Sequence, residues 1–184
     1  MMNDELSSDE HLVKQIQQGS GEAMSILYRR HRPAILRYVQ ARVYNWQQAQ
    51  DLTGEIFLSM VAHLPQYQIT GVPFTAWLFR IAHNTVITYR QKESRLPLVP
   101  ISHADNGSRP EDNPALLVAN EMEMDWVWHG LQQIDENQRD VIILRFLVGL
   151  SLQEAAHALD KSVGAIKTLQ HRGILALRVA LQVA

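Results

Sequence analysis

Residues 151–172 have the sequence SLQEAAHALDKSVGAIKTLQHR, the pattern of two short helices joined by a tight turn. Ser151 and Glu154 have the spacing of a capping box, in which the hydroxyl and the carboxylate each accept a hydrogen bond from a free backbone N–H. A second helix is expected to begin after Ser162, whose hydroxyl can cap it. Because a turn of this length makes the helices cross steeply, the second helix should project from the domain. The stretch therefore predicts a helix-turn-helix.

The second of these helices is basic. Between residues 161 and 178 the sequence has four cationic side chains and no carboxylate: Lys161, Lys167, Arg172 and Arg178. A projecting helix with this charge fits the major groove of DNA and its phosphates. A helical hairpin with a solvated basic face has the same local pattern, so this stretch alone leaves both interpretations open.

Composition narrows the class of protein. With 184 residues, 46% hydrophobic and 20% charged, the chain can form one globular domain or two small ones. It has no apolar run near the ~20 residues of a membrane span, and its acidic start lacks a signal-peptide pattern. We expect a cytoplasmic protein without membrane insertion. Having no cysteine and no close pair of histidines, it is expected to hold no disulfide, metal or cofactor.

Charge is distributed unevenly along the chain. Residues 1–95 carry 10 basic and 8 acidic groups, residues 96–125 carry 1 and 6, and residues 126–184 carry 6 and 5. Both ends are thus mildly basic and the middle is strongly acidic. The acidic segment could shield a DNA-binding surface or imitate phosphate when DNA is absent, although a solvated linker is the simpler interpretation.

Helical periodicity dominates the first 95 residues. Pro33 should kink or break the second helix near residues 30–32, because proline removes a hydrogen bond and clashes with the previous turn. The first helix is expected to open with a capping box of Ser7 and Glu10. The four expected helices are a short one ending at Gly19, then residues 22–43, residues 47–64 and Phe74–Arg95.

The third expected helix has an apolar stripe that Phe57 and Val61 widen. Asp51 and Glu55 lie four residues apart and so share one helix face, where they could hold a basic partner. Paired carboxylates can also perform acid–base chemistry. No histidine, serine nucleophile or phosphate-binding loop accompanies them in a recognisable motif, so the sequence predicts no enzyme.

The fourth expected helix combines an apolar face with a mixed one. Rings, amides and cations together can stack on unpaired bases while following a nucleic-acid backbone. A purely structural aromatic face is the alternative. The mixed residues are Phe79, Arg80, His83, Asn84, Thr88, Tyr89, Arg90, Lys92 and Arg95.

The remaining sequence divides the chain. Prolines and polar residues without periodicity predict a flexible linker at 96–114. Helical patterns resume at about 115–131 and at 136–147, and Gly149 should end the latter. The predicted fold is all-α, with helical domains at 1–95 and 115–184. The second domain should be held together by Phe146, Leu150, Val163 and Ile166.

Three stretches resemble a known family. QDLTGEIFLSMVAHLPQY (residues 50–67) and PFTAWLFRIAHNTVITYRQKESR (73–95) look like region 2 of a bacterial RNA polymerase sigma factor. LQQIDENQRDVIILRFLVGLSLQEAAHALDKSVGAIKTLQHRGILALR (131–178) looks like region 4. A chain with only these two regions resembles the extracytoplasmic-function group, and the resemblance covers nearly everything except the linker.

The resemblance implies residue roles in the first domain. The family's polymerase-binding positions correspond to Asp51, Leu52, Glu55 and Phe57. Gly54 departs from the glutamine common there, and glycine inside a helix costs about 1 kcal/mol relative to alanine. Trp77 and Asn84 match the positions that capture an extruded base of the downstream (minus-ten) promoter element, and the loop at residues 66–72 would shape which base is accepted. The other residues assigned to melting are Phe79, Arg80 and Arg90.

In the second domain the resemblance implies a reader of the upstream (minus-thirty-five) element. Asp160 replaces the glycine usual in the turn, but aspartate tolerates a left-handed conformation, so the turn should survive. The residues assigned to upstream recognition are Ser162, Lys167, Thr168, His171 and Arg172.

The implied function is that of a non-enzymatic subunit that directs RNA polymerase to promoters in response to stress or an envelope signal. Its implied partners are the polymerase core, promoter DNA and an anti-sigma factor. Two alternatives stay open at this point. One is a free-standing helix-turn-helix repressor or activator, and the other is an enzyme, for which no catalytic constellation is present.

Overall fold

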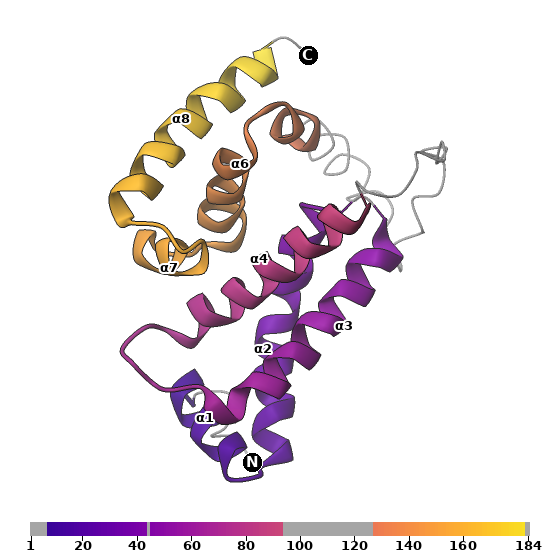
Figure 1. The fold of residues 1–184 in the computed structure, drawn as a ribbon, viewed down its shortest axis with the longest axis vertical. Coiled ribbons are helices and arrows are strands. Elements are labelled where there is room, and N and C mark those ends of the chain that lie inside the picture. Colours follow the sequence, from indigo (N-terminus) through magenta and orange to yellow (C-terminus); the bar gives the residue numbers. More distant parts are fainter. Residues whose placement is uncertain (1–6, 44, 94–126, 183–184) are drawn as a thin grey trace, which may run out of the picture.

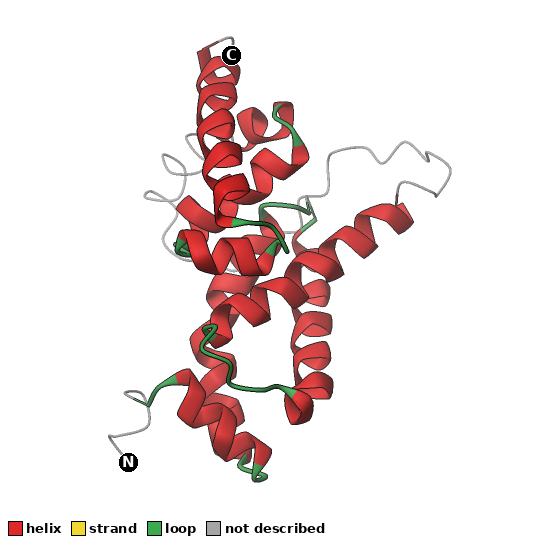
Figure 2. Cartoon of the chain, turned by 60° about the vertical axis from the view of Figure 1, so that its left-hand side comes forward, coloured by secondary structure: helices red, strands yellow, loops and turns green. Residues whose placement is uncertain are grey.

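The structure, a computed structural model, describes residues 7–43, 45–93 and 127–182. Within these ranges the chain forms helices and loops without a strand (Figure 2), which confirms the expected all-α fold. The linker expected at 96–114 and the helix start expected near residue 115 lie outside the described residues. The helices are α1 (Asp9–Gln17), α2 (Gly21–Gln40), α3 (Trp46–His63), η1 (Leu64–Gln66), α4 (Phe74–Glu93), residues 127–133, α6 (Glu136–Ile142), η2 (Ile143–Val148), α7 (Leu152–Ala158) and α8 (Val163–Gln182).

Helices α1 to α4 form the N-terminal domain, in which α2 packs against α1 and α3, and α3 packs against α4 (Figure 1). Large apolar side chains from all four helices fill its core, and burying each contributes roughly 1.5–3 kcal/mol. This packing fixes α3 and α4 with their outer faces turned away from the core. The fully buried side chains include Leu12, Leu27, Ile35, Ile56, Met60, Phe74 and Leu78.

Helix α1 begins one residue later than expected. Its N-cap is Ser8, whose hydroxyl accepts a hydrogen bond from the backbone N–H of His11 at 3.3 Å. The predicted capping box of Ser7 and Glu10 is therefore wrong, because Glu10 lies only two residues after the cap. Asp9 and Glu10 both lie in the first turn, where negative charge is favoured by the helix dipole.

Helix α2 is continuous from Gly21 to Gln40, so of the kink or break expected near residues 30–32 a break does not occur. Pro33 lies inside it and cannot donate to the carbonyl of Arg29. Both residues are exposed, so water can replace the missing hydrogen bond. Apolar contacts on either side of the proline hold the helix in place. The buried residues of α2 that flank it include Ile26, Leu27, Ile35, Tyr38 and Val39.

A polar clamp joins α1 to α2. One carboxylate oxygen of Asp9 accepts a hydrogen bond from Arg30 Nη1 at 2.6 Å, and the other lies 2.8 Å from Nε2 of the buried His31. The His31 ring packs against Phe74 of α4, with ring centroids 5.5 Å apart. Burial raises the pKa of Asp9, but the hydrogen bonds and charges of His31 and Arg30 outweigh burial and hold it below its usual value.

We expect Asp9→Asn to lower the free energy of unfolding by about 1–3 kcal/mol, because a charged acceptor is lost while His31 stays buried. The pKa of Asp9 is lower in the folded state, so its contribution is complete above a pH of about 4 and is lost as the pH falls through that folded-state pKa. Urea denaturation of both proteins at neutral and at acidic pH measures this effect. A difference that does not shrink in acid would contradict the role of the charge.

Helices α7 and α8 form the expected helix-turn-helix. Ser151 and Glu154 close the predicted capping box, with reciprocal hydrogen bonds of 3.2 and 2.8 Å. Asp160 has a φ of 53° in the turn, so aspartate adopts the left-handed conformation there as expected. Ser162 caps α8 by accepting from the backbone N–H of Ala165 at 3.2 Å.

The helix expected at 136–147 forms as α6 and η2, but η2 is a π-helix. Gly149 ends it with a φ of 90°, as expected. Arg145 of η2 donates to the carbonyl of Leu150 and, at 3.0 Å, to the side chain of Gln170 on α8. It thereby links the start of the helix-turn-helix to the middle of α8.

The π-helix also changes which side chains enter the C-terminal core. Leu150 and Ile166 are buried as expected, but Phe146 is 60% exposed and Val163 is 37% exposed. The predicted inward positions of Phe146 and Val163 are both wrong. The wider helical turn of η2 shifts the direction of Phe146 relative to an α-helix, whereas Val163 lies at the exposed start of α8.

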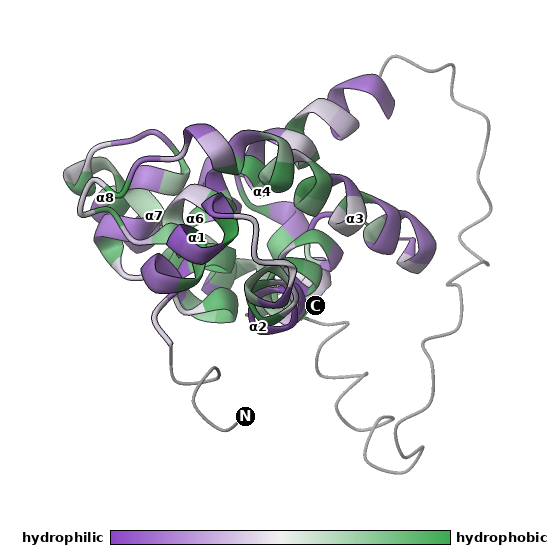
Figure 3. Cartoon of the chain, turned by 90° about the horizontal axis from the view of Figure 1, so that it is seen from below, coloured by the Kyte–Doolittle hydropathy of each residue, from purple (hydrophilic) through white to green (hydrophobic). Residues whose placement is uncertain are grey.

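The C-terminal helices pack against the N-terminal domain. Helix α7 lies against α4 (Figure 1). The π-helix η2 lies against α2. Hydrophobic and hydrophilic residues are interleaved along α4 and α8 (Figure 3), so faces outside the two cores remain for polar contacts. No described helix combines the length and apolarity needed to cross a membrane.

Candidate nucleic-acid interface

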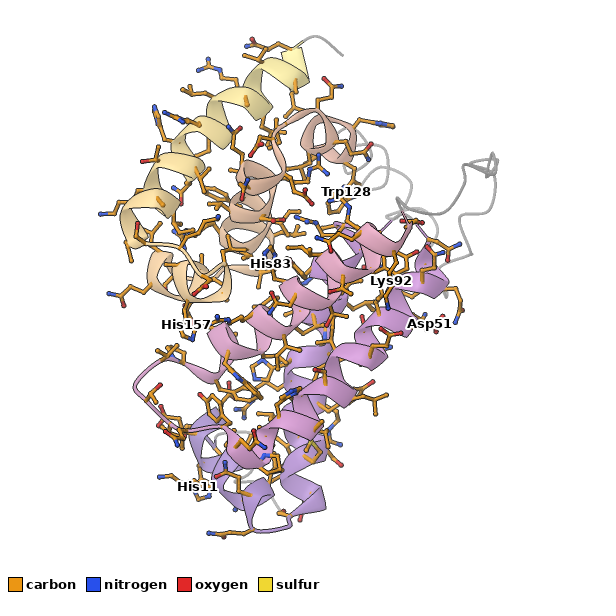
Figure 4. All side chains as sticks on the ribbon, viewed as in Figure 1. His11, Asp51, His83, Lys92, Trp128 and His157 are labelled. Carbon is orange, nitrogen blue, oxygen red and sulfur yellow. The ribbon has the colours of Figure 1, made fainter. Side chains whose placement is uncertain are left out.

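The outer face of α3 carries the predicted acidic pair. Asp51 and Glu55 are both exposed, and Asp51 lies on the side of α3 away from the C-terminal helices (Figure 4). Gly54 between them does not interrupt the helix, and a Cβ added there would meet no atom within 4 Å. The acidic pair is therefore presented on a regular helical surface.

The two apolar residues assigned to the same contact lie beneath this surface. Leu52 is 4% exposed and Phe57 is 6% exposed. The Phe57 ring meets the ring of Tyr28 edge-on, with centroids 4.7 Å apart. In this structure Leu52 and Phe57 therefore fix α3 from inside and are not exposed to a partner.

Two exposed apolar residues of α3 were not predicted as such from the sequence. Leu58 is 72% exposed and Val61, which was expected to widen the buried stripe, is 45% exposed. The three-residue step from Glu55 to Leu58 follows the four-residue step from Asp51 to Glu55, so the helical period could have placed Leu58 on the acidic face. A surface that combines acidic and apolar groups is more typical of a binding site for a partner than of a surface that meets only solvent.

Helix α4 presents only part of the predicted melting set. Asn84 is exposed, and Trp77 is half-buried against the rings of Tyr67 and Phe74, with centroids 4.6 and 5.5 Å away. Tyr67 belongs to the loop between α3 and α4, so this loop does contact Trp77. The indole is thus held by neighbouring rings, while the amide of Asn84 is free to meet a base edge.

Phe79 does not belong to this exposed set. It is fully buried, and its ring meets that of Tyr38 edge-on with centroids 5.7 Å apart. Its ring is unavailable for base stacking in this structure, so we correct its position from the mixed face of α4 to the core.

The two predicted cations of α4 are paired with the C-terminal domain. Arg90 Nη1 donates to Glu136 Oε1 at 2.5 Å, and Arg80 Nη2 lies 3.5 Å from a carboxylate oxygen of Asp160. Their side chains are 36% and 41% exposed. Both guanidinium groups are therefore partly accessible, and both are neutralised within the chain.

A buried polar cluster lies between these pairs. Arg42, in the turn after α2, has a fully buried side chain that forms ion pairs with Asp140 and, at 3.2 Å, with Glu136. Tyr38 Oη lies 3.2 Å from Nδ1 of His83, and Figure 4 shows His83 where α4 faces the C-terminal helices. No local sequence pattern could have joined these residues, because Arg42 and Glu136 are 94 positions apart.

The cluster has defined protonation states at neutral pH. Burial, together with the charges of Arg42 and Lys161, lowers the pKa of His83 to about 4. Burial also raises the pKa of Tyr38 to about 12. The phenol of Tyr38 can therefore donate its hydrogen bond to a neutral imidazole of His83, which leaves Arg42 as the cation that the carboxylates neutralise.

The first turns of α8 present the predicted upstream-reading residues together. Lys167 and His171 form one row at a four-residue step, and Thr168 and Arg172 form the next. All four are exposed. The hydroxyl of Thr168 donates to the carbonyl of Gly164 at 3.1 Å, and the N-cap Ser162 is also exposed. This face can enter a major groove without rearrangement of α8.

The C-terminal domain also has an apolar cleft of about 710 Å³ on another side. Phe146, which the sequence placed in the core, forms part of its wall. Other lining residues are Trp128, Leu131, Leu147, Ile174 and Leu177. Among the described residues, no cluster of three or more histidine and carboxylate side chains could hold a metal ion.

Comparisons with known proteins agree with this arrangement. The chain matches the models of sigma-70 region 2 over residues 27–96 and of sigma-70 region 4 over residues 130–179. It is 33% identical to the ECF RNA polymerase sigma factor BldN of Streptomyces coelicolor, covering 90% of this chain and 63% of BldN. It is 30% identical to the ECF RNA polymerase sigma factor ShbA of Streptomyces griseus, covering 97% of both chains.

Solved structures show the same fold. The chain is 26% identical to CnrH, solved in complex with the cytosolic domain of CnrY, with a TM-score of 0.75 over 96% of this chain and 99% of CnrH. Sequence coverage, the order of the two regions and the fold therefore agree. The chain belongs to the extracytoplasmic-function group of RNA polymerase sigma factors.

Proposed function

We propose that this chain binds the RNA polymerase core through the outer face of α3 and directs it to promoters. Helix α4 helps to open the downstream element, and α8 reads the upstream element. The protein acts in the cytoplasm, responds to stress or an envelope signal and catalyses no reaction itself. Its working units are the domains at 1–95 and 115–184.

The observation that carries this proposal is the exposed row of polar residues at the start of α8. Lys167, Thr168, His171 and Arg172 lie together on a capped helix that follows a tight turn. Within the part of the chain that the structure describes, none of these four side chains forms an ion pair. Their charges and hydrogen-bonding groups are therefore available to DNA. The acidic and apolar face of α3 lies on a different surface, which allows polymerase and DNA to be bound together.

Co-purification with polymerase core, followed by transcription in vitro from the promoters that the complex selects, tests the proposal directly. The chain should form a complex with core, and core alone should not start transcription at those promoters. A free-standing repressor or activator would bind duplex DNA without core. The affinity of such a protein for DNA would be unchanged by substitutions on the outer face of α3.

We expect Asn84→Ala to weaken preference at one downstream promoter base by about 1–3 kcal/mol, while changing stability little, because this exposed amide can bond a base edge. Transcription from single-base promoter variants and thermal unfolding measure the two effects. Asn137→Ala, which removes an exposed amide from α6, is the matched control. Equal losses at every base, together with a lower melting temperature, would make Asn84 structural.

We also propose that an anti-sigma factor controls this chain. CnrH, to which it is similar, is solved with the cytosolic domain of CnrY. The apolar cleft beside Phe146 offers a surface that an apolar segment of such a protein could cover.

A further inference from the structure

One face of the N-terminal domain gathers three arginines toward the C-terminal domain. On α4, Arg80, His83 and Arg90 follow one another at steps of three and seven residues, which places them on the same side of the helix. Arg42 adds a third guanidinium from the turn after α2. We refer to Arg42, Arg80 and Arg90 as the cationic face.

The carboxylates that pair with the cationic face all come from the C-terminal domain. Two belong to α6 and the third lies in the turn of the helix-turn-helix. We call these three residues the carboxylate set. The pairs are Arg90 with Glu136 at 2.5 Å, Arg42 with Glu136 at 3.2 Å and with Asp140, and Arg80 with Asp160 at 3.5 Å.

While the two domains are packed together, the cationic face requires an anion. The side chain of Arg42 is fully buried, and a guanidinium removed from water is strongly unfavourable unless a negative group compensates it. Carboxylate and phosphate satisfy a guanidinium with the same planar, two-pronged geometry. The anion that the carboxylate set supplies within the chain could therefore also be supplied by a nucleic-acid backbone.

We propose that the cationic face binds the phosphate backbone of promoter DNA, and that the carboxylate set occupies it in place of phosphate when DNA is absent. This inference rests on the proposed function, because it adds a backbone site, including Arg42, beside the base-contacting residues of α4. Since α7 packs against α4, the two domains must separate for the exchange to take place.

The position of the cationic face favours nucleic acid over an acidic protein. Asn84 lies next to His83 in sequence and is exposed, and Trp77 lies two turns before it. A strand whose bases reach Trp77 and Asn84 must place its backbone beside them, along the same helix. The strong acidity expected of the linker is not needed for this mechanism, since the carboxylate set lies in α6 and the turn before α8.

The double variant Glu136→Gln and Asp160→Asn tests the proposal. Both residues are exposed, at 54% and 81% of their side chains, and Asp140 remains to compensate Arg42, so the fold should persist. Binding of the full chain to a fluorescein-labelled oligothymidylate should tighten by about tenfold, and the salt dependence should steepen by about 0.7 for each phosphate newly contacted.

The matched control is the double variant Glu10→Gln and Glu22→Gln, which changes net charge equally at exposed positions of α1 and α2. Its affinity should rise much less. Adding Arg90→Gln to the Glu136→Gln and Asp160→Asn background should remove most of the gain. Equal tightening in test and control variants, or a gain that survives Arg90→Gln, would overturn the proposal.

Domain separation can be measured independently, because the chain has no cysteine of its own. Gln18→Cys and Gln132→Cys place labels at exposed positions of the two domains. The distance between the labels should be narrowly distributed in the free chain, and should change and broaden when oligothymidylate is added. Oligothymidylate that binds without changing this distance would refute the exchange of carboxylate for phosphate.

These experiments distinguish a failure of this inference from a failure of the proposed function. A chain that opens and binds oligothymidylate through the cationic face, yet supports no promoter-specific transcription with core, would retain this inference and reject the proposed function. Normal transcription, together with DNA binding that substitutions in the carboxylate set do not change, would reject this inference and retain the proposed function.

Discussion

Replacing both Asp51 and Glu55 with lysine is expected to weaken binding to polymerase core by at least about 100-fold, while leaving the helical content unchanged. Placing like charges against each other across an interface costs several kcal/mol, and about 2.7 kcal/mol already corresponds to 100-fold. Both residues are exposed on α3, so their replacement removes no core contact. Titration of labelled core with each protein measures the affinity.

The control for this experiment is the variant Glu10→Lys and Glu22→Lys, which changes net charge by the same amount at exposed positions of α1 and α2. It should bind core nearly as tightly as the unaltered chain. If both variants lost affinity equally, the acidic pair would have no special role and the effect would be one of overall charge. Circular dichroism of both variants confirms that α3 remains folded.

The second large effect is expected on α8, where Lys167 and Arg172 should differ in role. Residues near the start of a recognition helix lie deepest in the groove, so Lys167→Ala should relax preference at one or two upstream positions by about 1–3 kcal/mol. Arg172, more than one turn later, should contact phosphate. Arg172→Ala should weaken binding to every duplex alike and reduce the salt slope by about one unit.

A panel of single-base promoter variants, measured at several salt concentrations with the full chain, separates these two roles. Arg178→Ala is a useful control, since Arg178 is exposed further along the same helix. An Arg172→Ala loss confined to one base position, with an unchanged salt slope, would exchange the assignments of the two residues.

The features predicted well from the sequence depend on neighbours in the chain. The capping box at Ser151 and Glu154, the left-handed Asp160 and the end of η2 at Gly149 are each determined within a few residues. Their hydrogen bonds and backbone angles hardly depend on distant packing. The helix-turn-helix and the exposed face of α8 followed from these local patterns.

The features predicted wrongly depend on packing across the fold. Periodicity put Phe79 on a mixed face, yet Tyr38 of α2 encloses it in the core. Pro33 was expected to kink or break α2, but core contacts on both sides keep the helix unbroken. The π-helix turned Phe146 toward solvent. For Phe79 and Pro33 tertiary contacts overrode a local preference, whereas Phe146 was misplaced because an apolar helical pattern does not distinguish a π-helix from an α-helix.

Asp160 joins two requirements that oppose each other. Its left-handed backbone, with a φ of 53°, strains any residue other than glycine by about 1 kcal/mol or more. A glycine would relax the turn, but it would have no carboxylate to place near Arg80. The helix-turn-helix would then be less strained, but the two domains would be held together less strongly. Variation at this single position can therefore shift the balance between closed and open molecules without altering any residue that meets DNA.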